Sequence, residues 1–230
     1  MDLIEDENII KIKEVWKDLL DDDKNVFKSC QKDWIVVLRK MPETLTNEGR
    51  KVVNEKFAKY RGSLFNVINI FNKFNPTETR EKITNSMFDL KTVAYIVGTN
   101  VIAKDYVCND NIIYGGGFHY FKSVEPAYYA EICNFKYLHS NEFTGKKVIW
   151  LDNGMLYDIS TYVKGRRNGV CYEWTAKNEK IIYNYVNGIK HGVYEIFHQN
   201  GEKIIDGYYR NNVINTRWNE NSALSKNLIL

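Results

Sequence analysis

Hydrophobic residues near the start of the chain recur at intervals of three and four positions. Ile9, Ile12, Trp16 and Leu19 follow this spacing up to an acidic run at 21–23. Side chains spaced in this way lie on one face of an α-helix. The pattern therefore predicts an amphipathic helix that ends at the acidic run.

Similar spacing continues through the rest of the first 90 residues. A run from 26 to 38 predicts a second helix, and 46–60, 64–71 and 76–90 predict three shorter ones. Pro76 suits the first turn of the last helix, because a proline loses no hydrogen bond there. We expect residues 1–90 to form a helical region.

Strand-like runs replace the helical spacing after residue 91. Segments rich in Val, Ile and Tyr stand at 93–98, 101–103, 112–114 and 128–133, between Gly, Asn and Asp residues that favour turns. These segments predict short strands, and we interpret 91–142 as a β-rich connecting region.

A motif returns three times toward the C-terminus. Trp150, Trp174 and Phe197 are 24 and 23 residues apart, and each precedes a polar, turn-forming step. A second motif lies between them, at 162–169 and 185–192 and more loosely at 208–216. Repetition at a fixed period indicates one supersecondary unit stacked on copies of itself, because a single copy is too small to bury its apolar face.

The composition of the repeat predicts a β-hairpin. Residues 193–198 alternate in character and are rich in β-branched and aromatic types, and 203–209 can return as the partner strand. Asn200-Gly201 between them suits a two-residue hairpin turn. We therefore expect 143–216 to form an antiparallel meander of hairpins, with tyrosines and tryptophans filling one side.

The repeat also carries a family resemblance. The register Tyr-x-Asn-Gly-x-x-x-Gly-x-Tyr stands at 185–194 and is followed by Asn200-Gly201. These motifs resemble the MORN repeat family, in its longer variant close to bacterial antitoxin-like proteins. The resemblance covers 143–215, about a third of the chain, with Asn211-Asn212 in place of one Asn-Gly. It implies a role in protein assembly or in binding acidic lipid headgroups.

Together these patterns predict an α+β protein. Its segments would be a helical region at 1–90, a β-rich connecting region at 91–142, MORN-like β-hairpin repeats at 143–216 and a C-terminal tail at 217–230.

Composition narrows the class of protein. The chain has 230 residues, of which 44% are hydrophobic and 27% charged, with a net charge of +3. This near balance is unlike the basic surface of a nucleic-acid-binding protein. No window approaches the about 20 apolar residues of a membrane span. The four cysteines are far apart and have no His at metal-ligand spacing, so we expect reduced, buried thiols, no metal, and a cytoplasmic or other reducing compartment.

Candidate catalytic chemistry is sparse. Gly115-Gly116-Gly117 resembles a glycine loop that approaches an anion, but it lacks the Lys-Ser/Thr of a P-loop. His119 and His139 are candidate general bases, although no Ser, Cys or carboxylate stands at a recognisable motif distance. A His-dependent hydrolase is therefore kept as an alternative.

A second alternative comes from a resemblance near the N-terminus. Leu19, Leu20 and the acidic run that follows, then Phe27, Cys30 and Trp34, are similar to the latter half of an F-box. This helical motif docks onto a ubiquitin-ligase adaptor, and the resemblance implies that the repeats would recruit a substrate.

The preferred hypothesis is a non-enzymatic protein-interaction or scaffold protein without a cofactor, whose partner is a protein of unknown identity. Rigid aromatic side chains supply large contact area at low entropic cost. The predicted binding residues are the aromatic residues of the repeats: Tyr162, Trp174, Tyr185, Tyr194 and Tyr208.

Overall fold

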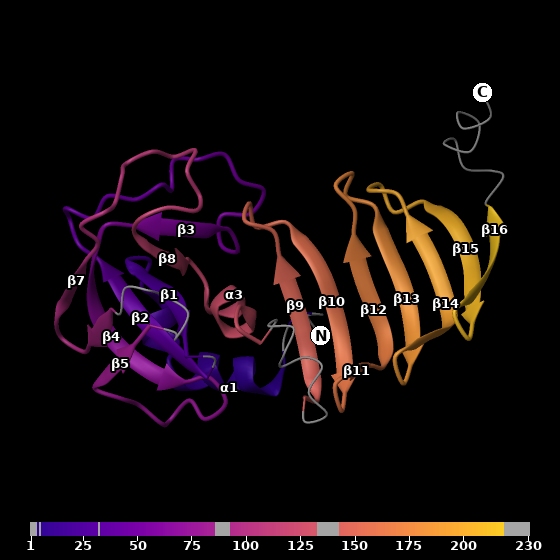
Figure 1. The fold of residues 1–230 in the computed structure, drawn as a ribbon, viewed down its shortest axis with the longest axis horizontal. Helices are drawn as coiled ribbons and strands as arrows, with labels where there is room; N and C mark the ends of the chain where they lie inside the picture. Colours follow the sequence, from indigo (N-terminus) through magenta and orange to yellow (C-terminus); the bar gives the residue numbers. More distant parts are fainter. Residues whose placement is uncertain (1–3, 5, 32, 86–92, 133–142, 219–230) are drawn as a thin grey trace. The chain divides into compact units, whose positions relative to one another are not determined.

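The computed structural model describes residues 4, 6–31, 33–85, 93–132 and 143–218, which form two compact units. Unit 1 contains Met1–Ile132 and Trp150–Met155, and unit 2 contains Cys133–Ile149 and Leu156–Leu230. Antiparallel sheets are the main regular structure of the described chain, with three short helices in unit 1 (Figure 1). No described helix is long and apolar enough to cross a membrane.

The predicted α+β fold with a helical region at 1–90 is wrong. Among the described residues of that region, only the start is helical, in α1 (Glu7–Val15) and α2 (Lys17–Asp21). The described residues that follow contain five strands: β1 (Asn25–Cys30), β2 (Trp34–Lys40), β3 (Lys59–Gly62), β4 (Leu64–Asn72) and β5 (Lys82–Thr84).

The error has a physical reason. Residues 34–38 are all buried, so β2 is covered on both faces and its sequence does not alternate. A short apolar run of this kind has the same appearance in a buried strand and in a buried helix. The β-branched Ile35, Val36 and Val37 favour the strand.

The main sheet of unit 1 has six strands in the order β3-β8-β1-β2-β4-β7, and β5 pairs with β6 in a separate two-stranded sheet. The remaining strands are β6 (Ala94–Ile96), β7 (Asn100–Ile102) and β8 (Phe118–Phe121). Two of the strand predictions, at 93–98 and 101–103, therefore contain strands. The other two are wrong, because 112–114 is not a strand and α3 (Val124–Tyr129) occupies the start of 128–133.

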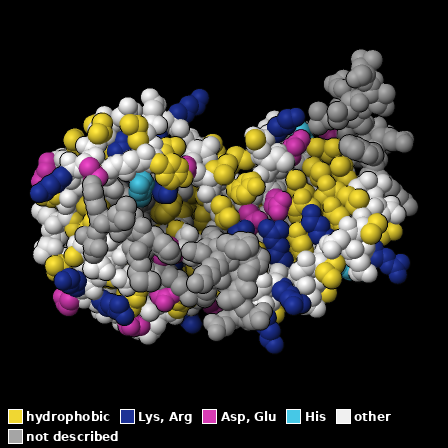
Figure 2. Space-filling model, viewed as in Figure 1, with side chains coloured by type: hydrophobic (Ala, Val, Ile, Leu, Met, Phe, Trp, Pro, Cys, Tyr) yellow, Lys and Arg dark blue, Asp and Glu magenta, His cyan; other side chains and the backbone are white. Residues whose placement is uncertain are grey.

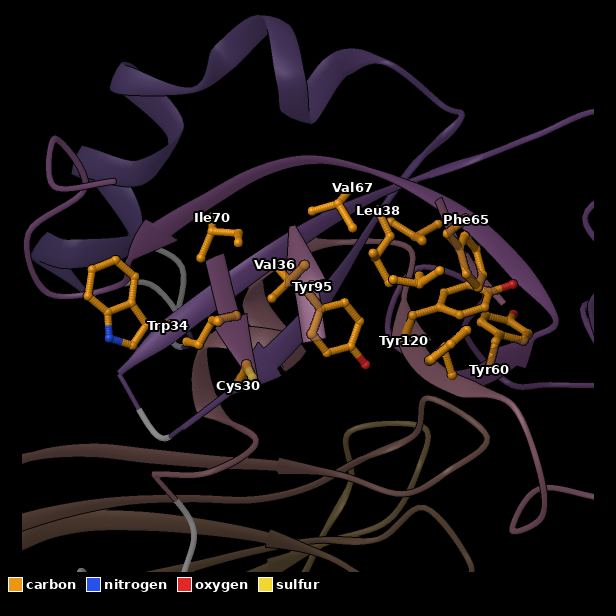
Figure 3. Close-up of a cluster of buried hydrophobic side chains, with 14 of the residues drawn as sticks. Cys30, Trp34, Val36, Leu38, Tyr60, Phe65, Val67, Ile70, Tyr95 and Tyr120 are labelled. Atoms are coloured by element: carbon orange, nitrogen blue, oxygen red, sulfur yellow. The ribbon is translucent and has the colours of Figure 1, made fainter. Parts of the chain in front are cut away.

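Both faces of this sheet are buried. On one face, Tyr60 and Phe65 contact Tyr120 with ring centroids 5.9 and 5.2 Å apart, within a larger apolar cluster (Figure 3). Helices cover the other face. There α3 contacts β1, and Trp16, which precedes α2, stacks on Phe71 of β4 with ring centroids 5.7 Å apart. Buried apolar area on both sides is the main stabilising term for such a layered unit.

Unit 2 is built on one antiparallel sheet. Its strand order is β11-β10-β12-β13-β14-β15-β16, and β9 also pairs with β10. The strands are β9 (Gly145–Trp150), β10 (Leu156–Val163), β11 (Arg166–Arg167), β12 (Gly169–Trp174), β13 (Lys180–Val186), β14 (Ile189–Phe197), β15 (Lys203–Arg210) and β16 (Val213–Trp218).

The repeat motif marks equivalent strand ends. Trp150, Trp174 and Phe197 are the last residues of β9, β12 and β14, as their spacing predicts. Each precedes a five-residue loop closed by the same backbone hydrogen bond, between the first N–H and the last carbonyl, at 2.8, 3.0 and 2.8 Å. Asn200-Gly201 lies in the third of these loops, so the predicted two-residue turn there is wrong.

Two-residue turns occur at the other ends of the strands. Lys164-Gly165, Asn187-Gly188 and Asn211-Asn212 each have φ positive at both positions, between 48° and 84°. This geometry is that of a type I′ hairpin turn. Asn tolerates positive φ better than other non-glycine residues, which explains how Asn211-Asn212 makes the turn without glycine.

Candidate binding surface

Strand register divides the aromatic residues of unit 2 between the two faces of its sheet. Tyr183 is paired with Tyr194, and Tyr194 with Gly207, so side chains at these positions point to one face. Successive residues in a strand alternate between faces, which places Tyr185 and Tyr209 on the same side. We call this side the tyrosine face; its members are Tyr162, Arg167, Tyr183, Tyr185, Lys190, Tyr194 and Tyr209.

The five predicted binding residues do not share one surface. Tyr162, Tyr185 and Tyr194 belong to the tyrosine face, but Tyr162 and Tyr185 are buried, so only Tyr194 of these three is open to a partner. Tyr208 follows Gly207 in β15, and Trp174 is paired with Lys180, so both point to the opposite face. Aromatic spacing along the chain identified strand ends, but the face of each residue depends on the strand register.

Three tyrosines from three neighbouring strands form the centre of the tyrosine face. Tyr183 and Tyr194 are stacked, with ring centroids 5.5 Å apart, and Tyr194 meets Tyr209 edge-on at 5.2 Å. Their hydroxyl groups make no hydrogen bond to any described residue, and each residue is partly exposed. The cluster therefore offers aromatic surface and unused hydroxyl groups to the solvent.

Lys190 lies over this cluster. Its Nζ atom is 3.9 Å from the ring centroid of Tyr183 and 5.0 Å from that of Tyr209, within the range of cation–π attraction. It forms no ion pair with a described residue. Burial lowers the pKa of Lys190, while the charge of Glu173 opposes the shift. The ammonium group is thus partly desolvated, and no carboxylate of the described residues lies within ion-pair distance.

Arg167, by contrast, is fully engaged. Its guanidinium group donates to the hydroxyl of Tyr185 at 3.1 Å and pairs with Asp158 and Glu173 at 3.3 and 3.4 Å. Burial alone would lower the pKa of Arg167, but the hydrogen bond to Tyr162 and the charge of Asp158 reverse the shift. Among the cations of the tyrosine face, Lys190 is therefore the better placed to meet a new anion.

The space-filling view agrees with this distribution. Figure 2 shows hydrophobic side chains gathered over β13 and β14, with Lys or Arg and Asp or Glu side chains beside them. A contiguous exposed apolar patch on a folded protein commonly marks an interaction site.

The catalytic alternative centres on a cavity of unit 1. His119, Asp105 and the three glycines at 115–117 line a space of about 630 Å³. Nε2 of His119 is 3.0 Å from the carbonyl of Ile113, and burial lowers the pKa of His119. The described residues that line this cavity include no Ser, Thr or Cys, so no hydroxyl or thiol nucleophile of these types accompanies His119.

Arg61 stabilises the glycine loop that lines this cavity. Its side chain is completely buried, and its guanidinium group donates to four backbone carbonyls between 2.7 and 3.0 Å away. The acceptors are Val107, Asn109, Ile112 and Gly116. Packing of the loop requires a glycine at 116, because a Cβ there would lie 2.0 Å from the carbonyl oxygen of Asp105.

The other sequence candidates do not assemble into a site. His139 lies outside the described residues. The acidic run at 21–23 begins at the last residue of α2, and Asp22 pairs with Arg39. No three His, Cys, Asp or Glu side chains of the described chain are grouped to hold a metal. Cys30 and Cys171 are buried as expected, whereas Cys108 is exposed.

The run that resembles an F-box has a different backbone. Phe27 and Cys30 lie in β1, and Trp34 begins β2. These residues therefore lack the helical structure that the resemblance implies.

No protein-family model, curated protein or solved structure matches the chain. The resemblance to MORN repeats accordingly depends on the motifs and their spacing.

Proposed function

We propose that this chain is a non-enzymatic protein-interaction protein, whose tyrosine face binds an acidic segment of a partner protein. The main support for this proposal is the environment of Lys190. Its partly buried ammonium group lies over two tyrosine rings and forms no ion pair with a described residue. A partner carboxylate would supply the missing charge.

Aromatic chemistry supports a protein partner. Tyr183, Tyr194 and Tyr209 hold one another through ring contacts, so little side-chain entropy remains to be lost on binding. Tyrosine is enriched among the residues that dominate binding energy at protein interfaces. The free hydroxyl groups can also donate to backbone carbonyls of a partner.

The charge of the surface favours an acidic segment flanked by apolar side chains. Lys190 attracts the carboxylate, and the surrounding rings accept the apolar neighbours. Acidic lipid headgroups, the other ligand class implied by the MORN resemblance, would need several free cations. Arg167 already pairs with Asp158 and Glu173, which leaves Lys190 as the one cation of the tyrosine face without an ion pair to a described residue.

Phage display of a random peptide library tests the proposal. The full chain would be the bait, in parallel with the variants Lys190→Glu and Lys180→Glu. Lys180 lies in the same sheet on the opposite face and provides a charge-matched control. We expect enriched peptides to combine Asp or Glu with apolar residues, and to bind the Lys180→Glu variant but not the Lys190→Glu variant.

Two results would overturn the proposal. Enrichment of peptides without acidic residues would remove the assigned role of Lys190. Equal binding to both variants would place the binding site away from the tyrosine face. Circular dichroism of each variant must show the wild-type fold before either result is interpreted.

A further inference from the structure

A second cavity in unit 1 has features of a small-ligand site unrelated to the tyrosine face. Its volume is about 420 Å³, within the range of small-molecule pockets. Four lysines line it, together with apolar side chains and two acidic ones, Asp21 and Glu125.

The lysines of this cavity are not equivalent. Lys13 pairs with Glu125 at 3.0 Å, and Lys122 pairs with Glu48 at 3.0 Å. Lys17 and Lys56 are exposed and form no ion pair with a described residue. Two ammonium groups from separate segments of the chain are therefore available to one anion.

Ser123 adds an unusual polar group to the wall. It precedes α3, where a serine side chain normally accepts a hydrogen bond from the second or third helical N–H. The third residue is Pro126, which has no N–H, and the serine makes no capping hydrogen bond. Its hydroxyl oxygen is buried and has no hydrogen-bond partner among the described residues. Such groups are rare and call for an explanation.

We propose that this cavity binds a small phosphate monoester. Lys17 and Lys56 would contact the phosphate oxygens as point charges, a role that lysine fills in many phosphate sites. Ser123 also lines the cavity, and a rotamer that turns its hydroxyl toward the phosphate would let it donate to the same group. Leu20 and Phe27 give the wall an apolar part that suits the organic part of the ester.

Asp21 allows a test in which phosphate binding should become tighter. It lines the cavity and forms no ion pair with a described residue, so its carboxylate repels a bound phosphate. Asp21→Asn should therefore tighten binding, in contrast to the loss expected from the lysine and serine variants.

Isothermal titration calorimetry of the full chain with phenyl phosphate tests the proposal, with inorganic phosphate and phenol as the separate parts of the probe. We expect phenyl phosphate to bind more tightly than either part. The Lys17→Gln/Lys56→Gln variant should weaken binding by about tenfold or more, because each lost charge-assisted hydrogen bond is worth a factor of this order. Ser123→Ala should also weaken it.

The matched control is Lys11→Gln/Lys51→Gln, which removes two exposed lysines from neighbouring segments outside the cavity. It should bind phenyl phosphate like the wild type. Equal affinity for phenol and phenyl phosphate would contradict a phosphate site. Equal loss in both double variants would show adventitious binding to the general positive charge, and no binding by the wild type would also overturn the proposal.

A thermal measurement without ligand separates the two roles of Ser123. An unsatisfied buried hydroxyl destabilises the folded state, so Ser123→Ala should melt no lower than the wild type. A lower melting temperature would show that the hydroxyl supports the fold and would remove it from the proposed site. The lysine variants still test the site in that case.

Discussion

Tyr183 and Tyr194 face each other across β13 and β14, with their ring planes inclined by 26° and their centroids 5.5 Å apart. Both tyrosines are partly exposed, so part of each side chain is available to a partner. Tyr209 extends the cluster into β15, and Lys190 covers part of it. Stability and the proposed binding thus depend on the same residues.

Tyr194 separates the contribution of the ring from that of the hydroxyl. Tyr194→Ala removes ring contacts with both Tyr183 and Tyr209 and should reduce the free energy of unfolding by about 2 kcal/mol. Tyr194→Phe keeps the ring, and the hydroxyl it removes has no hydrogen-bond partner among the described residues, so stability should change by less than about 0.5 kcal/mol. Urea denaturation measures both. A large loss in the phenylalanine variant would reveal a role for the hydroxyl.

Gly192 is a conformational requirement of β14. Its φ is +99°, and a Cβ would lie 3.0 Å from Nδ2 of Asn184. Gly192→Val should therefore destabilise the protein by about 1 kcal/mol or more, because a β-branched side chain is strained at positive φ. His191→Val, at the preceding position where φ is not positive, is the control. Equal melting temperatures for the two variants would contradict this account.

Arg61 should not tolerate replacement by lysine. Lys carries one ammonium group, which cannot reproduce the four carbonyl hydrogen bonds made by the planar guanidinium group. Because the site is completely buried, Arg61→Lys should cost about 3 kcal/mol or more. Thermal unfolding measures the loss. A near-wild-type melting temperature would mean that the wall at 107–116 does not depend on these bonds.

Glu48 should make stability depend on acid pH. It accepts a 2.6 Å hydrogen bond from Tyr120 and pairs with Lys122. Burial by itself raises the pKa of Glu48, but these partners outweigh it and the net shift is downward. A depressed carboxyl pKa stabilises the folded state above the unfolded pKa of about 4.3, and this contribution is lost as pH falls through the folded pKa.

The variant Glu48→Gln tests this assignment. Its free energy of unfolding should be lower than that of the wild type at pH 7, and the difference should shrink as the pH falls below about 4.3. Denaturation curves between neutral and acid pH give the comparison. A constant difference across that window would show that Glu48 does not titrate with folding.

The sequence carried reliable information where the turn chemistry is repeated. Asn187-Gly188 and the three aromatic strand ends occupy equivalent places in successive hairpins. Residues with strong conformational preferences, such as Gly and Asn at positive φ, limit the local structure directly. The strands of the repeat could accordingly be located from their spacing.

The sequence led to a wrong secondary-structure prediction where strands are buried on both faces and therefore lack alternation of apolar and polar residues. In β1 and β2, apolar residues fill both faces, and a helical interpretation of Phe27, Cys30 and Trp34 was as consistent as a strand. The tyrosine face could not be predicted from the sequence either. Lys190 contacts Tyr183 across two strands whose register is irregular between Tyr183 and Tyr185. Contacts of this kind depend on pairing, which composition does not determine.

If one face of the repeat sheet binds the partner, two neighbouring tyrosines in β15 should differ in their contribution to binding. Tyr208 and Tyr209 are adjacent in sequence but point to opposite faces. The measurement is the dissociation constant of the best-enriched acidic peptide for Tyr208→Ala and Tyr209→Ala, both confirmed as folded. We predict that Tyr209→Ala weakens binding by about tenfold or more, and that Tyr208→Ala changes it by less than about twofold. Loss of binding in Tyr208→Ala with retention in Tyr209→Ala would contradict the account.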